Sequence, residues 1–185
     1  MKILALSGSL RQASINSALL RAATRFAPPG ASVTLFNGLG KLPLFNPDRE
    51  ETPPRTVTRF RARVAASDAL LIASPEYAHG VTGTIKNALD WLVGFEPFAC
   101  KPVAVLNASS RAHHADAALR EILKTMAAAI VEPASVLVPP LGANPADALA
   151  FDHAVEQPIR ETLTALCDAV RLHLRAAVSD QCGVN

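Results

Sequence analysis

Cysteine is scarce in this sequence and offers no pattern for a disulfide framework or a metal site. The 185 residues include only Cys100, Cys167 and Cys182, which lie far apart and form no C-x-x-C pair. Disulfide-rich secreted domains carry an even number of closely spaced cysteines, and structural zinc sites need paired ligands at short spacing. We therefore expect a protein of a reducing compartment, the cytoplasm, without a metal centre.

Concentrated charge and long apolar runs are also missing. The 18 Lys and Arg against 16 Asp and Glu give a net charge of +2, and the basic residues form no block. Nucleic-acid binding needs a concentrated basic surface. No stretch reaches the ~18 apolar residues of a membrane span, and the apolar run at the N-terminus is too short for a secretory signal. These observations predict a soluble protein that binds neither nucleic acid nor membrane.

What the sequence has in abundance is short apolar runs, and half of its residues are hydrophobic. Such runs are typical of strands buried on both faces of a sheet. They occupy residues 3–6, 32–36, 69–73, 103–106 and 135–138. Between and after them, apolar residues recur at helical spacing, over residues 15–26, 54–67, 85–92, 119–126 and 159–174. The last of these helices is expected to start at Pro158, because proline is tolerated in the first helical turn.

Strand and helix thus alternate five times, which predicts an α/β fold with a doubly wound parallel sheet. Five strands favour the flavodoxin-like order 2-1-3-4-5, with helices on both faces, over a six-stranded dinucleotide-binding fold. The length suits one domain, which we place at residues 1–178. Residues 179–185 are expected to form a flexible tail.

Hydroxyl groups and an arginine follow the first predicted strand. Residues 7–16 read SGSLRQASIN, which puts polar side chains at the carboxyl end of a strand and the positive end of a helix. A phosphate monoester needs several donors and some positive charge, and this loop supplies both without a metal. The glycine fingerprints of dinucleotide and triphosphate sites are absent. The loop predicts a phosphomonoester site; the alternative is that Ser9 and Ser14 only cap the helix and Arg11 is a solvated charge.

A second motif follows the third predicted strand, where residues 74–91 read SPEYAHGVTGTIKNALDW. Together with GSLRQASIN at 8–16, this motif resembles the NADPH-dependent FMN reductase family, which includes bacterial chromate, quinone and azo-dye reductases. The motifs stand in the right order at the right strand ends, and the alternating pattern covers nearly the whole chain.

The resemblance implies a flavin mononucleotide (FMN) cofactor held by three loops. The first loop would hold the phosphate, the second would lie beside the isoalloxazine ring, and the loop after the fourth strand would donate to the N1/O2 edge of the ring. The residues so assigned are Ser9, Arg11, Ser14, Ile15 and Asn16 for the phosphate, Pro75, Glu76, Tyr77 and Ala78 for the ring, and Ser109, Ser110 and Arg111 for its N1/O2 edge.

The second loop departs from the family pattern at three positions. The family commonly has Asn, Ser and Pro where this chain has Ala78, Gly80 and Thr82. His79 occupies a place from which it could replace part of the lost polar contact, although a lone loop histidine is more often a surface residue. The adjacent His113 and His114 have no further ligands nearby in the sequence, so no metal site is expected there.

The resemblance further implies that NADPH reduces bound FMN, which then reduces a small acceptor such as a quinone, chromate, an azo compound or free flavin. The flavin supplies the electronic chemistry, so no catalytic side chain is expected. The family also implies a homodimer or homotetramer. Two alternatives stay open: a flavodoxin-type electron carrier without a nicotinamide site, and a regulatory domain that has lost its flavin.

Overall fold

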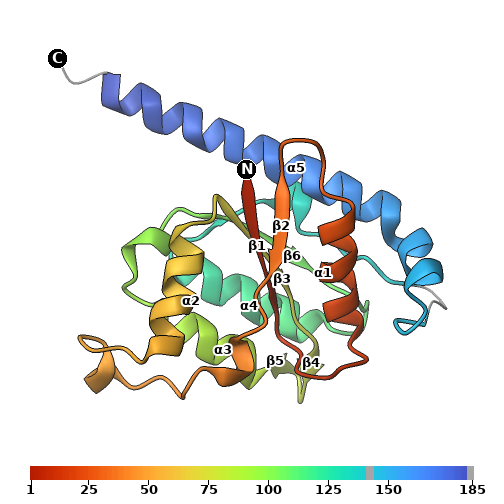
Figure 1. The fold of residues 1–185 in the computed structure, drawn as a ribbon, viewed down its shortest axis with the longest axis horizontal. Coiled ribbons are helices and arrows are strands. Elements are labelled where there is room, and N and C mark those ends of the chain that lie inside the picture. The colour runs from red at the N-terminus through yellow and green to blue at the C-terminus, as the bar shows by residue number, and fades with distance from the viewer. Residues whose placement is uncertain (141–143, 183–185) are drawn as a thin grey trace.

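A parallel sheet of five strands forms the centre of the protein (Figure 1). The computed structural model describes residues 1–140 and 144–182, with side chains up to residue 175. The strands are β1 (Lys2–Ser7), β2 (Ser32–Leu35), β3 (Ala69–Ala73), β6 (Pro102–Leu106) and β7 (Ala129–Ile130). Their spatial order is β2-β1-β3-β6-β7, which confirms the predicted flavodoxin-like order.

Strand β1 lies between β2 and β3, and its Ile3 pairs with Val33 of β2 on one side and Ala69 of β3 on the other. Every residue of β3 and β6 is buried. Strands covered on both faces need no polar side, so their sequences read as continuous apolar runs. That continuity made β1, β3 and β6 visible in the sequence, whereas the edge strand β2 has exposed side chains at Ser32 and Thr34.

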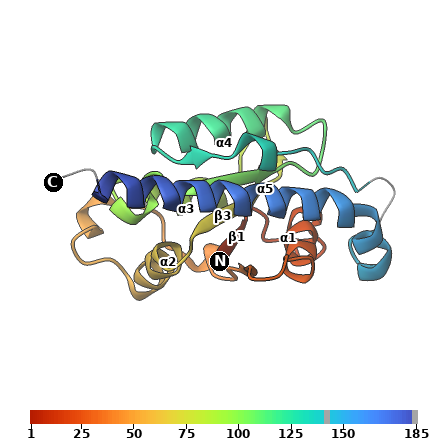
Figure 2. The same ribbon diagram turned by 90° about the horizontal axis from the view of Figure 1, so that it is seen from above.

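Helices cover both faces of the sheet, as Figures 1 and 2 show. The helices are α1 (Ile15–Arg25), α2 (Arg55–Ala65), α3 (Gly83–Asp90), α4 (His113–Thr125) and α5 (Ala148–Cys182). Leu19 of α1 and Leu163 of α5 belong to the core on one face. Phe60 of α2, Leu89 of α3 and Leu123 of α4 belong to the core on the other. None of the helices in the described ranges combines the length and hydropathy that crossing a bilayer requires.

Short elements occupy the connections. The 3-10 helices are η1 (Leu39–Lys41), η2 (Pro47–Arg49), η3 (Glu96–Phe98) and η4 (Glu132–Ala134), and a small hairpin pairs β4 (Glu76–Tyr77) with β5 (Gly80–Val81). The sequence showed none of these elements, because each is too brief to have a hydrophobic period.

The fifth strand differs from its prediction at residues 135–138. Strand β7 lies earlier in the chain, at Ala129–Ile130, and η4 interrupts the extended backbone after it. Residues 136–138 then rejoin the sheet beside Asn107, whose N–H donates to Val136 O at 3.0 Å and whose carbonyl accepts from Val138 N at 2.8 Å. The interruption falls at Pro133, which has no N–H for a sheet ladder.

Helix α5 starts at Ala148, ten residues before the predicted start, and Pro158 lies inside it. The Asp147 carboxylate accepts from Ala150 N at 3.1 Å, which caps the earlier start. Phe151 and Val155 are buried and extend the four-residue spacing backward from Ile159. The predicted tail at 179–185 overlaps the helix, which reaches Cys182, while 183–185 lie outside the described residues; the domain boundary stays a prediction.

Candidate active site

A cavity of about 480 Å³ opens at the carboxyl edge of the sheet, where the loops after β1, β3 and β6 meet. All of the residues assigned from the sequence line it except Ala78 and Ser110. Residues that the assignment missed are Ala13, Ser74, Asn107, Ala108, Ala112 and Pro145. Ser74 and Asn107 come directly after β3 and β6, and the rule that ligands bind at the carboxyl ends of parallel strands was a signal that could have found them.

The loops after β1 and β3 are fixed to each other by close backbone approach. Gly8 N donates to Ala73 O at 2.9 Å, and the Thr82 hydroxyl donates to Gly8 O at 2.8 Å. A Cβ atom on Gly8 would lie 2.2 Å from Ser74 Oγ, so only glycine fits. Thr82 also accepts from Ile85 N at 3.3 Å and so caps α3. The Thr82 departure from the family pattern therefore has a structural role.

The first loop presents a row of unused backbone donors. Ser14 caps α1, since its hydroxyl accepts from Ser17 N at 3.2 Å. Within the part of the chain that the structure describes, no acceptor is found for the N–H groups of residues 12–16. These amides stand at the positive end of a helix beside the cavity, which is a ready arrangement for an anion.

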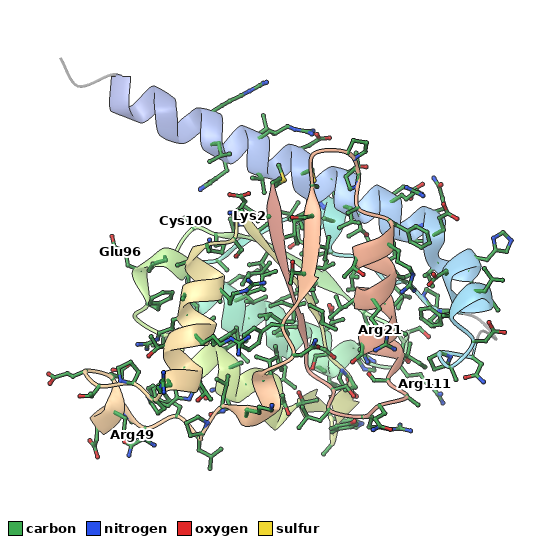
Figure 3. The ribbon with its side chains drawn as sticks, in the orientation of Figure 1. Lys2, Arg21, Arg49, Glu96, Cys100 and Arg111 are labelled. Carbon is green, nitrogen blue, oxygen red and sulfur yellow. The ribbon has the colours of Figure 1, made fainter. Side chains whose placement is uncertain are left out.

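Two arginines add positive charge at this cavity. Arg11 and Arg111 both line it and are exposed, and neither takes part in the ion pairs found among the described residues. Figure 3 places Arg111 near the lower end of α1, the end from which the first loop emerges. Ser109 holds this loop in shape, because its hydroxyl accepts from Arg111 N at 3.3 Å and its N–H donates to Asn107 Oδ1 at 3.0 Å.

Asn16 carries an unpartnered polar atom in the cavity wall. The residue is only 7% exposed, and its Oδ1 has no hydrogen-bond partner among the described residues. A buried polar atom without a partner costs about 1–3 kcal/mol. A ligand that carries hydroxyl groups or another donor would remove that cost.

The Glu76 side chain links the second loop to helix α4. Its Oε2 accepts from Ala115 N at 2.9 Å, in the first turn of α4. This bond, with smaller contributions from the charges of His114 and His79, holds the pKa of Glu76 below its ordinary value of 4.5. Glu76 thus fixes the hairpin against α4, and Tyr77, which is 55% exposed, stands at the cavity mouth.

The remaining assigned residues, Ala78 and Ser110, lie outside the lining of the cavity. Ala78 and His79 form the hairpin turn with left-handed backbone angles, φ 49° and 57°. Ser110 is exposed and outside the lining. The imidazole of His79 stacks on that of His114 at 4.4 Å, and His113 lies 4.1 Å from His114. Across the described residues, no group of three or more His, Cys, Asp or Glu side chains is arranged to hold a metal ion.

The family model for NADPH-dependent FMN reductase matches residues 1–140. The chain belongs to this family. An NAD(P)H-dependent FMN reductase from Pseudomonas aeruginosa is 45% identical over 113 residues, covering 60% of each chain. A quinone reductase from Pseudomonas putida is 42% identical over 108 residues, covering 55% of this chain and 56% of the relative. The match thus spans less than two thirds of these curated relatives.

Solved structures extend the likeness to nearly the whole chain. The flavoenzyme NAD(P)H:(acceptor) oxidoreductase from Paracoccus denitrificans superposes with a TM-score of 0.75 at 26% identity, covering 93% of this chain and 98% of its own. Membership of the FMN reductase family and this superposition agree with the strand order found here.

Proposed function

We propose that this protein is an FMN-containing oxidoreductase that passes electrons from NADPH to a small acceptor such as a quinone, chromate, an azo compound or free flavin. The observation that carries the proposal is the first loop, where unused amides at residues 12–16, the Arg11 guanidinium and the unpartnered Asn16 Oδ1 face one cavity. Family membership supports it.

The donor set of the first loop fits a terminal phosphate. A phosphomonoester carries about two negative charges near pH 7, and a ring of N–H donors, a hydroxyl and a guanidinium can surround it. We assign this task to Ser9, Arg11, Ser14 and Asn16, with Ile15 acting through its backbone N–H. Asn16 would donate to the phosphate through Nδ2, while its Oδ1, an acceptor, suits a hydroxyl of the ligand.

The other two loops fit the flavin ring. Pro75, Glu76 and Tyr77 form one wall of the cavity, and Ser109 and Arg111 lie on another. A positive charge and donors beside the N1/O2 edge stabilise the reduced ring and raise its reduction potential. Ala78 and Ser110 are proposed to act only through the shape of their loops.

FMN, when bound, supplies a ring atom that accepts and returns hydride. The chain itself has to bind, orient and shield, and it needs no nucleophile. Glu76 holds the hairpin at the cavity mouth, and the Gly8–Thr82 bond holds the first two loops in register. Because the flavin would supply the chemistry and the chain only binds and orients it, we propose no catalytic side chain.

Assembly and location are part of the same proposal. Leu10 is 67% and Tyr77 55% exposed, and both follow strand ends at the cavity edge. A homodimer or homotetramer is proposed from the resemblance to the FMN reductase family, and these two exposed side chains are candidates for its interface. Cys100 and Cys167 are free thiols, which supports the cytoplasm.

The deciding experiment is a spectrum of the purified protein after incubation with FMN and gel filtration, with identification of the released cofactor, followed by anaerobic stopped-flow mixing with NADPH. We expect a flavin spectrum that bleaches on mixing and returns when a quinone is added. A protein that holds FMN but stays oxidised would be an electron carrier. A protein that holds no FMN would be a flavin-free domain. Either outcome would contradict the reductase proposal.

A further inference from the structure

Two cavities adjoin between strand β2 and helix α2, away from the proposed flavin site. One has a volume of about 320 Å³ and the other about 280 Å³, and both are lined by Thr34 and Arg63. The first includes the chain just after β2, and the second reaches Lys2 at the opposite end of the sheet. Both elements lie toward the viewer in Figure 1 and along the lower side of Figure 2.

The larger of these, which we call the β2–α2 cavity, is lined by three cationic side chains. Arg59 and Arg63 project from one face of α2, four residues apart, and Lys41 comes from η1. No carboxylate is among the lining residues. In the described ranges none of these three cations takes part in an ion pair.

In contrast to Arg59 and Arg63, Arg61 on the same helix has protein partners. Arg61 donates to Trp91 O at 2.8 Å and lies 3.8 Å from Glu50. At the far end of the second cavity, the Asp68 carboxylate is occupied by Lys2 N at 2.6 Å. Glu50 and Asp68 therefore have partners outside the β2–α2 cavity, while three like charges share it. Like charges repel, and an anion between them would reverse the sign of that interaction.

Neutral donors complete the lining. Thr34 and Thr56 contribute hydroxyl groups, and Asn37 contributes an amide. These three side chains make no hydrogen bond within the described part of the protein, and like the three cations they are exposed at the open side of the cavity. Unlike the flavin cavity, the lining contains no Ser-rich loop and few apolar side chains, only Leu35 and Phe36. Cations together with hydroxyl and amide donors are the groups that hold phosphate.

We propose that the β2–α2 cavity binds a phosphate-bearing small anion, held by Arg59, Arg63 and Lys41 with Thr56 and Asn37 as neutral donors. This is a second anion site, separate from the one proposed for FMN; its binding of phosphate does not depend on the proposed reductase activity, and only the assignment of the phosphate source rests on it. The phosphate has two possible sources, a free phosphorylated metabolite or the phosphate on the ribose of the nicotinamide cofactor.

Calorimetric titration of the FMN-saturated protein with inorganic phosphate and with adenosine 2′-monophosphate tests the proposal. If the protein does not bind FMN, the same titration is run on the Ser14→Asp variant, whose added negative charge keeps phosphate out of the first loop. Failure of the FMN proposal can then be distinguished from failure of the β2–α2 proposal. Work at ~0.15 M salt, where the Debye length is about 8 Å, suppresses non-specific attraction. The variant R59Q/R63Q is compared with R49Q/R55Q, which removes two exposed charges from the same segment outside the cavity.

We expect saturable binding of phosphate. The R59Q/R63Q variant should weaken the affinity by at least about tenfold, which corresponds to roughly 1.4 kcal/mol. The R49Q/R55Q variant should change the affinity by less than about twofold. Equal weakening by both variants, or no saturation with either probe, would overturn the proposal. The source is then read from kinetics: an increased KM for NADPH but not for NADH identifies the cofactor's ribose phosphate, and unchanged values identify a separate metabolite.

Discussion

Ser14 combines two tasks at the residue scale, and one substitution separates them. Its hydroxyl caps α1, and we propose that it also donates to the FMN phosphate. Aspartate caps helices as well as serine does, but it places a negative charge beside the phosphate. Ser14→Asp is therefore expected to keep the unfolding midpoint in urea while weakening FMN binding by about a hundredfold, roughly 2.7 kcal/mol.

The control for Ser14→Asp is riboflavin, which lacks the phosphate. Its affinity for the variant should stay close to that for the unchanged protein, as measured by quenching of flavin fluorescence. If FMN affinity is retained, the phosphate does not lie at this loop.

Arg11 offers a second test of the same loop. It lines the cavity without an ion-pair partner among the described residues, so its charge is available to the ligand. Because a hydrogen bond to a charged group contributes about 1.5–3 kcal/mol, Arg11→Gln is expected to weaken FMN binding by roughly tenfold or more. Arg21→Gln, on α1 outside the cavity lining (Figure 3), is the matched control and should have no effect in equilibrium dialysis.

The lowered pKa of Glu76 predicts that the stability of the protein falls in acid. The carboxylate accepts from Ala115 N at the start of α4, so the charged form is favoured in the folded protein. Its stabilising effect is present above the ordinary pKa of 4.5 and is lost as the pH falls through the lower, folded-state pKa. The Glu76→Gln variant should thus be less stable than the unchanged protein at pH 7.

Urea unfolding of both proteins between pH 3 and pH 7 measures this difference. It should shrink below about pH 4.5 and vanish in acid. A gap that stays constant across the range would show that the charge of Glu76 plays no part.

At the level of elements, the β4–β5 hairpin carries backbone strain that can be relieved. Ala78 adopts φ 49°, a left-handed conformation that costs most residues about 1 kcal/mol but that asparagine tolerates. Ala78→Asn is expected to raise the free energy of unfolding by roughly 0.5–1 kcal/mol, whereas Ala78→Val at the same position should lower it, because β-branched residues fit this conformation poorly. Two urea curves decide the matter, and equal effects of the two changes would contradict the argument.

Elements with an apolar period could be predicted from the sequence, and those defined by local hydrogen bonds could not. Strands β1, β3 and β6 are buried on both faces, so their runs are unbroken. The fifth strand was misplaced because residues 135–138 contain two valines and a leucine, which are typical of strands. The regular pairing occurs instead at Ala129–Ile130, in an alanine-rich stretch that continues the preceding helical pattern. The start of α5 was misplaced because proline is rare inside helices, while here buried packing at Phe151 and Val155 holds the helix together around Pro158.

The candidate site was predictable wherever a residue directly follows a strand or caps a helix. Chain direction alone brings such residues to one edge of the sheet. Ala78 and Ser110 fell outside the cavity because each sits at a loop apex, and apex geometry depends on turn angles that sequence spacing does not reveal. The pairing of Glu76 with α4 joins segments 39 residues apart, and only the assembled sheet brings them together.

On the scale of the whole molecule, cofactor binding should appear as thermal stability. A ligand that binds only the folded state stabilises it by about 2.7 kcal/mol when its concentration is 100 times its Kd. For a chain of this size, each kcal/mol raises Tm by roughly 2–4 °C, so saturating FMN is expected to raise Tm by roughly 5–10 °C. Differential scanning calorimetry with FMN, riboflavin and inorganic phosphate at equal concentrations resolves the contributions of ring and phosphate. Because the first loop has the richest set of unused donors beside the cavity, FMN should stabilise far more than riboflavin, and equal shifts for the two flavins would place the main binding energy on the ring instead.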